Sequence, residues 1–405
     1  MLLRSQREDS RGTLANLLAT AQADYDAGRL AQAAHTSKQI LALEPQHPGA
    51  LYLMGRIAYA DRCYAIAANY FAQAVSSAPQ DASLHSALGA AYQALGRFAD
   101  ALLSHQQALA REPNSPMALN NLGITLVSLH RTAQAVDTFQ QALGALPNDP
   151  ELLNNLGAAL RAGGRPAEAV PPLRRAVEVA PDFAQAHHNL GNACYDLGRL
   201  EEAVDNGQRA LQLRPDFTAA RVWLGVALAS QGRIEEALAC LREAHQQQCN
   251  DPVTHSTYLC ALSYDPRLGT EALSAEHRRW GSRQVAGLPA PRHANRPEPE
   301  RRLRVGYLSP DFRTHAVCYF VLPLVLSHDR RNVEVYCYSD VLRPDALTAR
   351  VRASADRWGE VANLSDDQLA ELIRQDQIDI LGDLTGHTGR HRLRLFARKP
   401  APVQV

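Results

Sequence analysis

The chain has 405 residues, of which 46% are hydrophobic and 21% are charged. Its 42 basic and 42 acidic side chains give a formal net charge of zero, so overall charge gives no reason to expect a nucleic acid or an anionic membrane as partner. The length predicts two or three domains, and the seven cysteines, which include no CxxC pair, favour reduced thiols in a cytoplasmic protein.

The first segment, residues 1–13, has the sequence MLLRSQREDSRGT. Its charges interrupt the apolar core that a signal peptide needs. No stretch elsewhere in the chain approaches the length of a membrane span. We therefore expect an N-terminal tail and no membrane partner.

A period of 34 residues governs the next part of the chain. Prolines recur at this interval, at Pro45, Pro79, Pro113, Pro147, Pro181 and Pro215. A glycine follows each proline at a constant distance, at Gly55, Gly89, Gly123, Gly157, Gly191 and Gly225. An alanine follows each glycine in the same way, at Ala67, Ala101, Ala135, Ala169, Ala203 and Ala237. Such a period predicts stacked structural repeats, and we count seven of them over residues 14–251.

Each repeat is expected to be a pair of antiparallel helices. Small side chains at the crossing let the two helices approach closely. A glycine such as Gly96 or Gly198 makes the turn between them, and the proline ends the second helix. This pattern resembles the tetratricopeptide repeat, which implies a right-handed superhelix.

Three asparagines, Asn121, Asn155 and Asn189, stand two residues before a repeat glycine. If the first helices line the concave face of the superhelix, these side chains form a row along its groove. A carboxamide offers both a donor and an acceptor and can bind the backbone of an extended peptide. The row would then serve protein or peptide substrates. The alternative is that asparagine is merely tolerated on an exposed helix face.

Two segments of different character follow the repeats. Residues 252–285 keep a helical pattern without the 34-residue period, and we expect an adaptor that covers the open end of the repeat array. Residues 286–301 hold four prolines and a run of charges, which is typical of a linker between domains.

The last part, residues 302–405, alternates expected strands with expected helices. Strands are predicted over 303–308, 333–339 and 378–384, and helices over 317–327, 346–355 and 366–374. This alternation predicts a parallel sheet flanked by helices. The fold class is therefore mainly α, a repeat superhelix followed by an α/β Rossmann-like domain.

Three strings in this last part carry a resemblance to a known family: RRLRVGYLSPDFRTHAVCYF, VEVYCYS and GDLTGHTGRHRLRLFARKPAPVQV. They resemble the first half of the catalytic region of the O-linked N-acetylglucosamine transferases and their SPINDLY relatives. The upstream strings HSTYLCALSYDP and AEHRRWG resemble the helical adaptor of that family. Since the family also begins with tetratricopeptide repeats, the resemblance covers essentially the whole chain.

The resemblance implies a GT-B fold and an inverting glycosyltransferase. The expected reaction moves N-acetylglucosamine from UDP-N-acetylglucosamine to serine or threonine of proteins, with no metal and no other cofactor. Two alternatives stay open: a GDP-fucose donor, as in the SPINDLY branch, and a peptide-binding scaffold without catalysis. The oligomeric state, including a homo-oligomer, also stays open.

The chain stops at Val405, where the family goes on to finish this domain and add a second one. The final PVQV has the character of an apolar strand. The chain is then either a fragment of a longer protein or an enzyme cut back to a repeat array with a partial domain, and the apolar end favours the fragment. We expect it to be inactive by itself, with the nucleotide-binding residues of the family beyond Val405.

The resemblance also points to site residues in two loops. His315, in SPDFRTHA, matches a family histidine beside the donor, and an imidazole can accept the proton of an attacking hydroxyl near neutral pH. Asp376 matches an aspartate that the family keeps near its active site, although a polar helix end is the alternative. Gly386 and His387 lie in TGHTGRH, where glycine permits close approach to a ligand or makes an ordinary turn. We expect both loops beyond the carboxyl ends of the strands.

Overall fold

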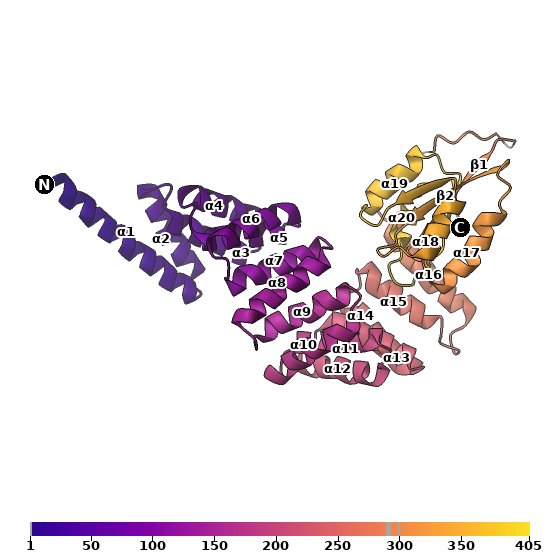
Figure 1. Cartoon of the computed structure of the whole chain (residues 1–405), viewed down its shortest axis with the longest axis horizontal. Coiled ribbons are helices and arrows are strands. Elements are labelled where there is room, and N and C mark those ends of the chain that lie inside the picture. The colour runs from indigo at the N-terminus through magenta and orange to yellow at the C-terminus, as the bar shows by residue number, and fades with distance from the viewer. Residues whose placement is uncertain (1, 289–292, 299) are drawn as a thin grey trace. The chain divides into compact units, whose positions relative to one another are not determined.

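Helical pairs and then a parallel sheet follow one another along the chain (Figure 1). The structure is a computed structural model that describes residues 2–288, 293–298 and 300–405, with side chains from residue 12 onward. It divides into two compact units, Met1–Phe217 and Thr218–Val405. Positions 289–292 and 299 of the predicted linker lie outside the described residues, and residues 293–298 have no regular secondary structure.

Each helical pair corresponds to one 34-residue repeat. The helices are α1 Leu2–Asp26, α2 Leu30–Leu43, α3 Pro48–Ala60, α4 Tyr64–Ser77, α5 Ala82–Ala94, α6 Phe98–Arg111, α7 Pro116–Ser128, α8 Thr132–Ala145, α9 Pro150–Ala162, α10 Pro166–Val179, α11 Ala184–Asp196, α12 Leu200–Leu213, α13 Thr218–Ser230 and α14 Ile234–Gln247. The predicted helical pairs are confirmed. Residues 2–13, expected as a tail, continue helix α1. None of the helices described is both long and apolar enough to cross a membrane.

The turn within each pair requires a left-handed backbone. The residues with positive φ at this position are Gly28, Arg62, Gly96, His130, Gly164, Gly198 and Gly232. Glycine adopts this conformation at little cost, whereas a residue with a Cβ does not. The repeat therefore imposes the same turn even where the sequence supplies arginine or histidine.

The repeat glycines lie where the two helices of a pair approach most closely. A methyl carbon added to Gly123 would lie 2.5 Å from the ring of Phe139. The repeat alanine one turn before that ring, Ala135, is fully buried. The crossing is thus made by a glycine against a large side chain, with the alanine beside it, and not by two small residues alone.

The segment after the repeats forms helices α15 (Pro252–Leu262) and α16 (Thr270–Val285). Leu259 of α15 and Trp280 of α16 share a buried cluster with Leu238 and Leu241 of α14. The Trp280 indole donates a hydrogen bond to the Pro252 carbonyl at 3.1 Å. As expected for an adaptor, these two helices cover the apolar side of the last helical pair.

The remaining residues form a five-stranded parallel sheet with strand order β3-β2-β1-β4-β5. Its elements are β1 Leu303–Ser309, α17 Ala316–Ser327, β2 Val333–Ser339, α18 Ala346–Ser354, β3 Arg357–Glu360, α19 Asp366–Gln375, β4 Ile380–Asp383, α20 Leu393–Ala397 and β5 Val403–Gln404. The predicted parallel sheet with flanking helices is confirmed. Strand β3 and helix α20 were not predicted, because RWGE has no apolar run and α20 has only five residues.

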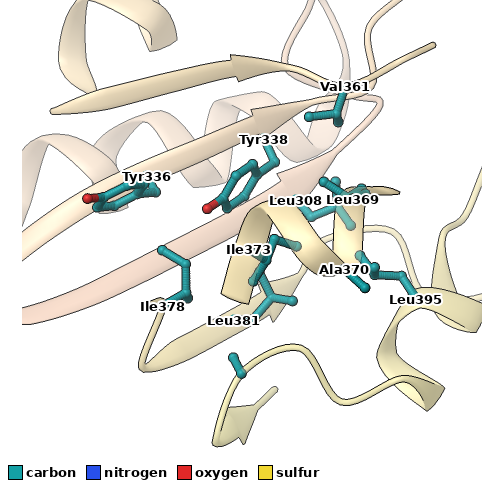
Figure 2. Packing of buried hydrophobic residues seen from close by; sticks show 11 residues of the cluster. Leu308, Tyr336, Tyr338, Val361, Leu369, Ala370, Ile373, Ile378, Leu381 and Leu395 are labelled. Carbon is teal, nitrogen blue, oxygen red and sulfur yellow. The ribbon is translucent and has the colours of Figure 1, made fainter. Parts of the chain in front are cut away.

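Both faces of the sheet are covered by helices. Alternate residues of β1 and β2, such as Val305 and Val335, pack against α17 and α18. The residues between them, such as Leu308 and Tyr338, pack with Leu369 and other side chains of α19 and α20 (Figure 2). This two-sided burial is what a parallel sheet requires, and it leaves the carboxyl edge of the strands to carry the site.

Candidate active site

The sheet reverses its strand order between β1 and β4. From β1 the chain proceeds to β2 and β3 on one side, and then to β4 and β5 on the other. Helices that cross in opposite directions leave a crevice at the carboxyl ends of such a strand pair, where ligands bind in open α/β sheets. The two predicted loops, 309–316 and 385–391, follow β1 and β4 at their carboxyl ends, as expected, and we call this edge of the sheet the crevice.

Hydrogen bonds hold the loop after β1. The amide of Asp311 donates to Ser309 Oγ at 3.0 Å, and both residues are buried. The amide of Thr314 donates to the carboxylate of Asp345, the N-cap of α18, at 2.6 Å. Hydrogen bonds from Thr314, and next those from Thr348, hold the pKa of the Asp345 carboxyl below its ordinary value. His315 therefore begins α17 from a constrained backbone.

His315 lies at the mouth of this loop with a side chain that is 41% exposed. Its Nδ1 accepts a hydrogen bond from the Val317 amide at 3.3 Å, and the same atom lies 3.6 Å from an Asp311 carboxylate oxygen. An unprotonated Nδ1 accepts from Val317, whereas a protonated Nδ1 donates toward Asp311. In the neutral ring, the second arrangement leaves the lone pair on Nε2. His315 can then accept a proton at Nε2.

Asp340 follows β2 at the same edge and is 2% exposed. Its Oδ2 lies 3.2 Å from a guanidinium nitrogen of Arg390, and its Oδ1 is buried without a hydrogen-bond partner in the described part of the chain. Burial raises the pKa of Asp340, and the charge of Arg390 opposes that shift. Arg390 has a φ of 62°, so the loop holds it against Asp340 at a conformational cost.

Asp383 ends β4 and organises the second loop. Its carboxylate accepts hydrogen bonds from the amides of Thr385 at 3.2 Å and Gly386 at 2.8 Å. Burial raises the pKa of Asp383, and the two amide bonds counteract it. Gly386 has a φ of 60° and open space where a Cβ would stand, so the turn favours glycine there. Contact of Gly386 with a ligand stays a prediction.

The structure places His387 differently from the expectation. Its ring turns away from the crevice and packs on the adaptor helices, with Nδ1 2.5 Å from Ser256 Oγ of α15. Trp280 of α16 contacts the ring edge to face, with centroids 4.9 Å apart. A residue held in this way is an internal anchor of the loop, and direct contact with substrate is not supported.

Asp376 lies at the opposite edge of the sheet. It is the C-cap of α19, ahead of β4, and its carboxylate accepts a hydrogen bond from the Tyr338 hydroxyl at 2.7 Å. A cavity of about 320 Å³ adjoins it, lined among others by Tyr336, Trp358 and Leu372. Because the strands are parallel, residues before β4 and residues after β1 are separated by the length of the sheet. The structure therefore does not bring Asp376 together with His315, and the polar helix end is what it shows.

The predicted asparagines form a regular row between repeats, which we call the inter-repeat ladder. In each step an asparagine carboxamide donates to the preceding repeat: Asn121 to Ser86 (3.3 Å), Asn155 to Asn120 (2.9 Å) and Asn189 to Asn154 (2.7 Å). All three donors are half-buried. The row is therefore neither a set of free peptide-binding groups nor mere tolerance of polarity, because it joins one repeat to the next.

The ladder lies on helices that touch their counterparts in neighbouring repeats. Contacts join α5 to α7, α7 to α9 and α9 to α11. Elements on the inner side of a curved stack lie closest together, which supports the concave placement. Binding of a peptide by these asparagines stays a prediction, since part of their hydrogen-bonding capacity is already used.

Comparison with known proteins separates the two parts of the chain. Residues 2–222, more than half of it, match the model of the cilia and flagella-associated protein 70 C-terminal domain, and residues 208–250 match the tetratricopeptide repeat. The repeat array belongs with these repeat domains. Residues 248–405, which contain the adaptor and the sheet, match the model of glycosyl transferase family 41. The part of the chain from residue 248 onward is therefore similar to glycosyl transferase family 41.

Named relatives of this chain are transferases. A protein of Oryza sativa subsp. japonica, named probable UDP-N-acetylglucosamine--peptide N-acetylglucosaminyltransferase SPINDLY, is 37% identical over 36% of this chain and 16% of its own length. The UDP-N-acetylglucosamine--peptide N-acetylglucosaminyltransferase of Caenorhabditis elegans is 31% identical over 37% of this chain and 14% of its own length. The match thus spans less than a fifth of either relative.

A solved structure is similar over a longer part of the chain. A mutant of the Thermobaculum terrenum O-GlcNAc transferase is 38% identical, covers 63% of this chain and 49% of its own, and superimposes with a TM-score of 0.59. This similarity agrees with the predicted order of repeats and Rossmann-like domain.

Sequence reasoning missed three carboxylates at the crevice, Asp311, Asp340 and Asp383, together with Arg390. A signal for the carboxylates was present, because each one ends or closely follows an apolar strand. The pairing of Asp340 with Arg390 had no signal, since it depends on a loop conformation.

Proposed function

We propose that this chain serves a protein O-glycosyltransferase that moves N-acetylglucosamine from UDP-N-acetylglucosamine to serine or threonine hydroxyls. The observation that carries the proposal is the position of His315, which stands at the β1–β4 crevice of a family 41 domain with a carboxylate beside its Nδ1. The names of the relatives support the donor and the acceptor. A fucosyl donor and a non-catalytic scaffold are not favoured by those names.

In this proposal His315 takes up the proton of the attacking hydroxyl through Nε2. Asp311, with a carboxylate oxygen 3.6 Å from Nδ1, stabilises the imidazolium that forms. We propose that no metal ion takes part, so transfer should continue in the presence of EDTA.

The repeats recruit the protein substrate in this proposal. The inter-repeat ladder stiffens the first helices, so that an extended peptide meets a preformed surface and loses less binding free energy to ordering. The seven cysteines are free, which supports the cytoplasm as the compartment.

The test is transfer of labelled N-acetylglucosamine to a protein acceptor by the complete gene product, with and without EDTA. His315→Ala should lower the rate by roughly 10²–10⁴ without changing the circular dichroism spectrum. His35→Ala, on the exposed side of α2, is the matched control and should leave the rate unchanged. An unchanged rate for folded His315→Ala, or transfer from GDP-fucose alone, would overturn the proposal.

A further inference from the structure

The ring of His387 lies in a socket built by the adaptor helices. Ser256, at its Nδ1, is 1% exposed, and Trp280, at its face, is 6% exposed. The ring centroid of His277, also from α16, lies 4.8 Å from that of His387. A serine hydroxyl and an indole ring both accommodate a neutral imidazole, and neither compensates a positive charge as a carboxylate does.

The charged and titratable groups around this socket are mostly other imidazoles. His255 of α15, His277 of α16 and His391 of the same loop all act on His387, after burial, to lower its pKa to about 4. Behind them, His245 of α14 stacks on His255 at 4.2 Å. The charge of Asp366 acts to raise the pKa of His391, whereas no carboxylate contributes to the pKa shift of His387. At His255, the charges of Arg283 and Arg279 lower the pKa and that of Glu276 raises it.

Along the chain, His387 lies between two residues that form hydrogen bonds at the crevice. On its amino side, the amide of Gly386 bonds to Asp383, and on its other side Arg390 pairs with Asp340. Farther on, Leu393 packs against the same cluster of adaptor side chains. A loop held at His387 and Leu393 has little freedom between them, so the position of Arg390 depends on both contacts.

We propose that His387 is a positioning residue whose neutral ring fastens loop 385–391 to helices α15 and α16, and that proton uptake by this ring releases the loop from the adaptor. The inference rests on the proposed function only in treating Arg390 and Asp383 as parts of an active site. It makes the adaptor a support of the crevice, and it makes that support sensitive to acid.

The size of the effect follows from linkage. A released ring titrates near its ordinary value of 6.5, whereas the docked ring titrates at about 4. The docked state is therefore fully favoured above about pH 6.5, and its ratio to the released state falls roughly tenfold per pH unit between these limits. At about pH 5 the expected loss is roughly thirtyfold.

The experiment is hydrogen exchange of the 405-residue chain, followed by mass spectrometry at pH 7.5 and pH 5.0 with correction for intrinsic exchange. Peptides over 385–391 should lose protection by roughly thirtyfold at the lower pH, and peptides over 309–316 should lose much less. His387→Tyr keeps an aromatic ring, adds a hydroxyl and does not titrate in this range, so its loop protection should change with pH much less than that of the wild type, by the part that His391 and His255 contribute. A wild-type loop that is equally protected at both values, or a His387→Tyr loop that responds as the wild type does, would overturn the inference.

A second variant covers the case in which His387→Tyr does not fold. Ser256→Ala removes the hydroxyl at Nδ1 and should lower protection of 385–391 at both pH values, with 309–316 unchanged. Equal protection in this variant and in the wild type would count against the anchor. None of these readouts requires sugar transfer, so the expected exchange in this chain, together with no transfer by the complete gene product, refutes the proposed function alone.

Discussion

The helical repeats and the parallel sheet build their interiors over different distances along the chain. In the repeats, Gly123 packs on Phe139 of the very next helix, and the ladder joins adjacent repeats. In the sheet, β1 pairs with β4, so Val305 stands beside Ile380 with two other strands between them in sequence. Near-neighbour contacts confine a disturbance to a few repeats, whereas a shared sheet spreads it through every strand.

The largest expected effect tests this difference directly. Leu173 of α10 and Leu381 of β4 are both fully buried, and truncation of either to alanine should cost about 2–5 kcal/mol. In hydrogen exchange, Leu173→Ala should lower protection in its own and adjoining repeats only. Leu381→Ala should lower it in all five strands. Uniform loss across all repeats in Leu173→Ala would break the comparison.

A smaller effect is expected at the close crossings. Gly123→Ala places a methyl carbon 2.5 Å from the Phe139 ring, and overpacking of this kind costs about 1–3 kcal/mol. Gly144→Ala is the matched control, because it lies in α8 with no atom within 4 Å of the new carbon. The control should be neutral or stabilising by up to about 1 kcal/mol. Urea unfolding of both variants decides, and similar midpoints would place the crossing elsewhere.

The repeats should also lose stability in acid through His105. This ring stands where other repeats have Phe71 and Phe139, and both of its nitrogens are buried without partners among the described residues. Burial lowers the pKa of His105 to about 4. The unfolded chain therefore binds the proton more tightly, so stability is full above about pH 6.5 and falls toward pH 4, by up to about 1.4 kcal/mol per unit.

Replacement of this histidine isolates its share of the acid sensitivity. His105→Phe should flatten the decline of the melting temperature between pH 7 and pH 5 relative to the wild type. Other buried histidines, such as His188, keep their own contribution. Parallel melting curves for the two proteins across this range would show that His105 is not the group responsible.

The smallest effect concerns the turns, where the repeats share one backbone conformation and differ in the residue that adopts it. His130 has a φ of 58°, so His130→Gly should stabilise the protein by about 1 kcal/mol. Gly198→Ala reverses the test, since its φ is 73° and no atom lies near the added carbon. Thermal unfolding should shift in opposite directions for the two variants. A shift in the same direction would mean that side-chain contacts, and not φ, set the cost.

The sequence by itself determined the periodic and local features of this protein. The 34-residue period specified the helical pairs, their left-handed turns and their glycine crossings. Apolar runs with a cap such as Ser365, which forms a capping box with Gln368, located most strands and helices of the sheet. All of these depend on residues within one or two turns of each other, so they can be recognised in a linear pattern.

The tertiary structure alone decided how distant residues meet. The polar segment Arg357–Glu360 became a strand because β2 supplies its hydrogen bonds. The order of the strands placed Asp376 at the edge opposite to His315. His387 turned into the adaptor because Ser256, 131 residues earlier, completes its socket. No local propensity encodes such pairings, since each one forms only when packing has brought two separate segments into contact.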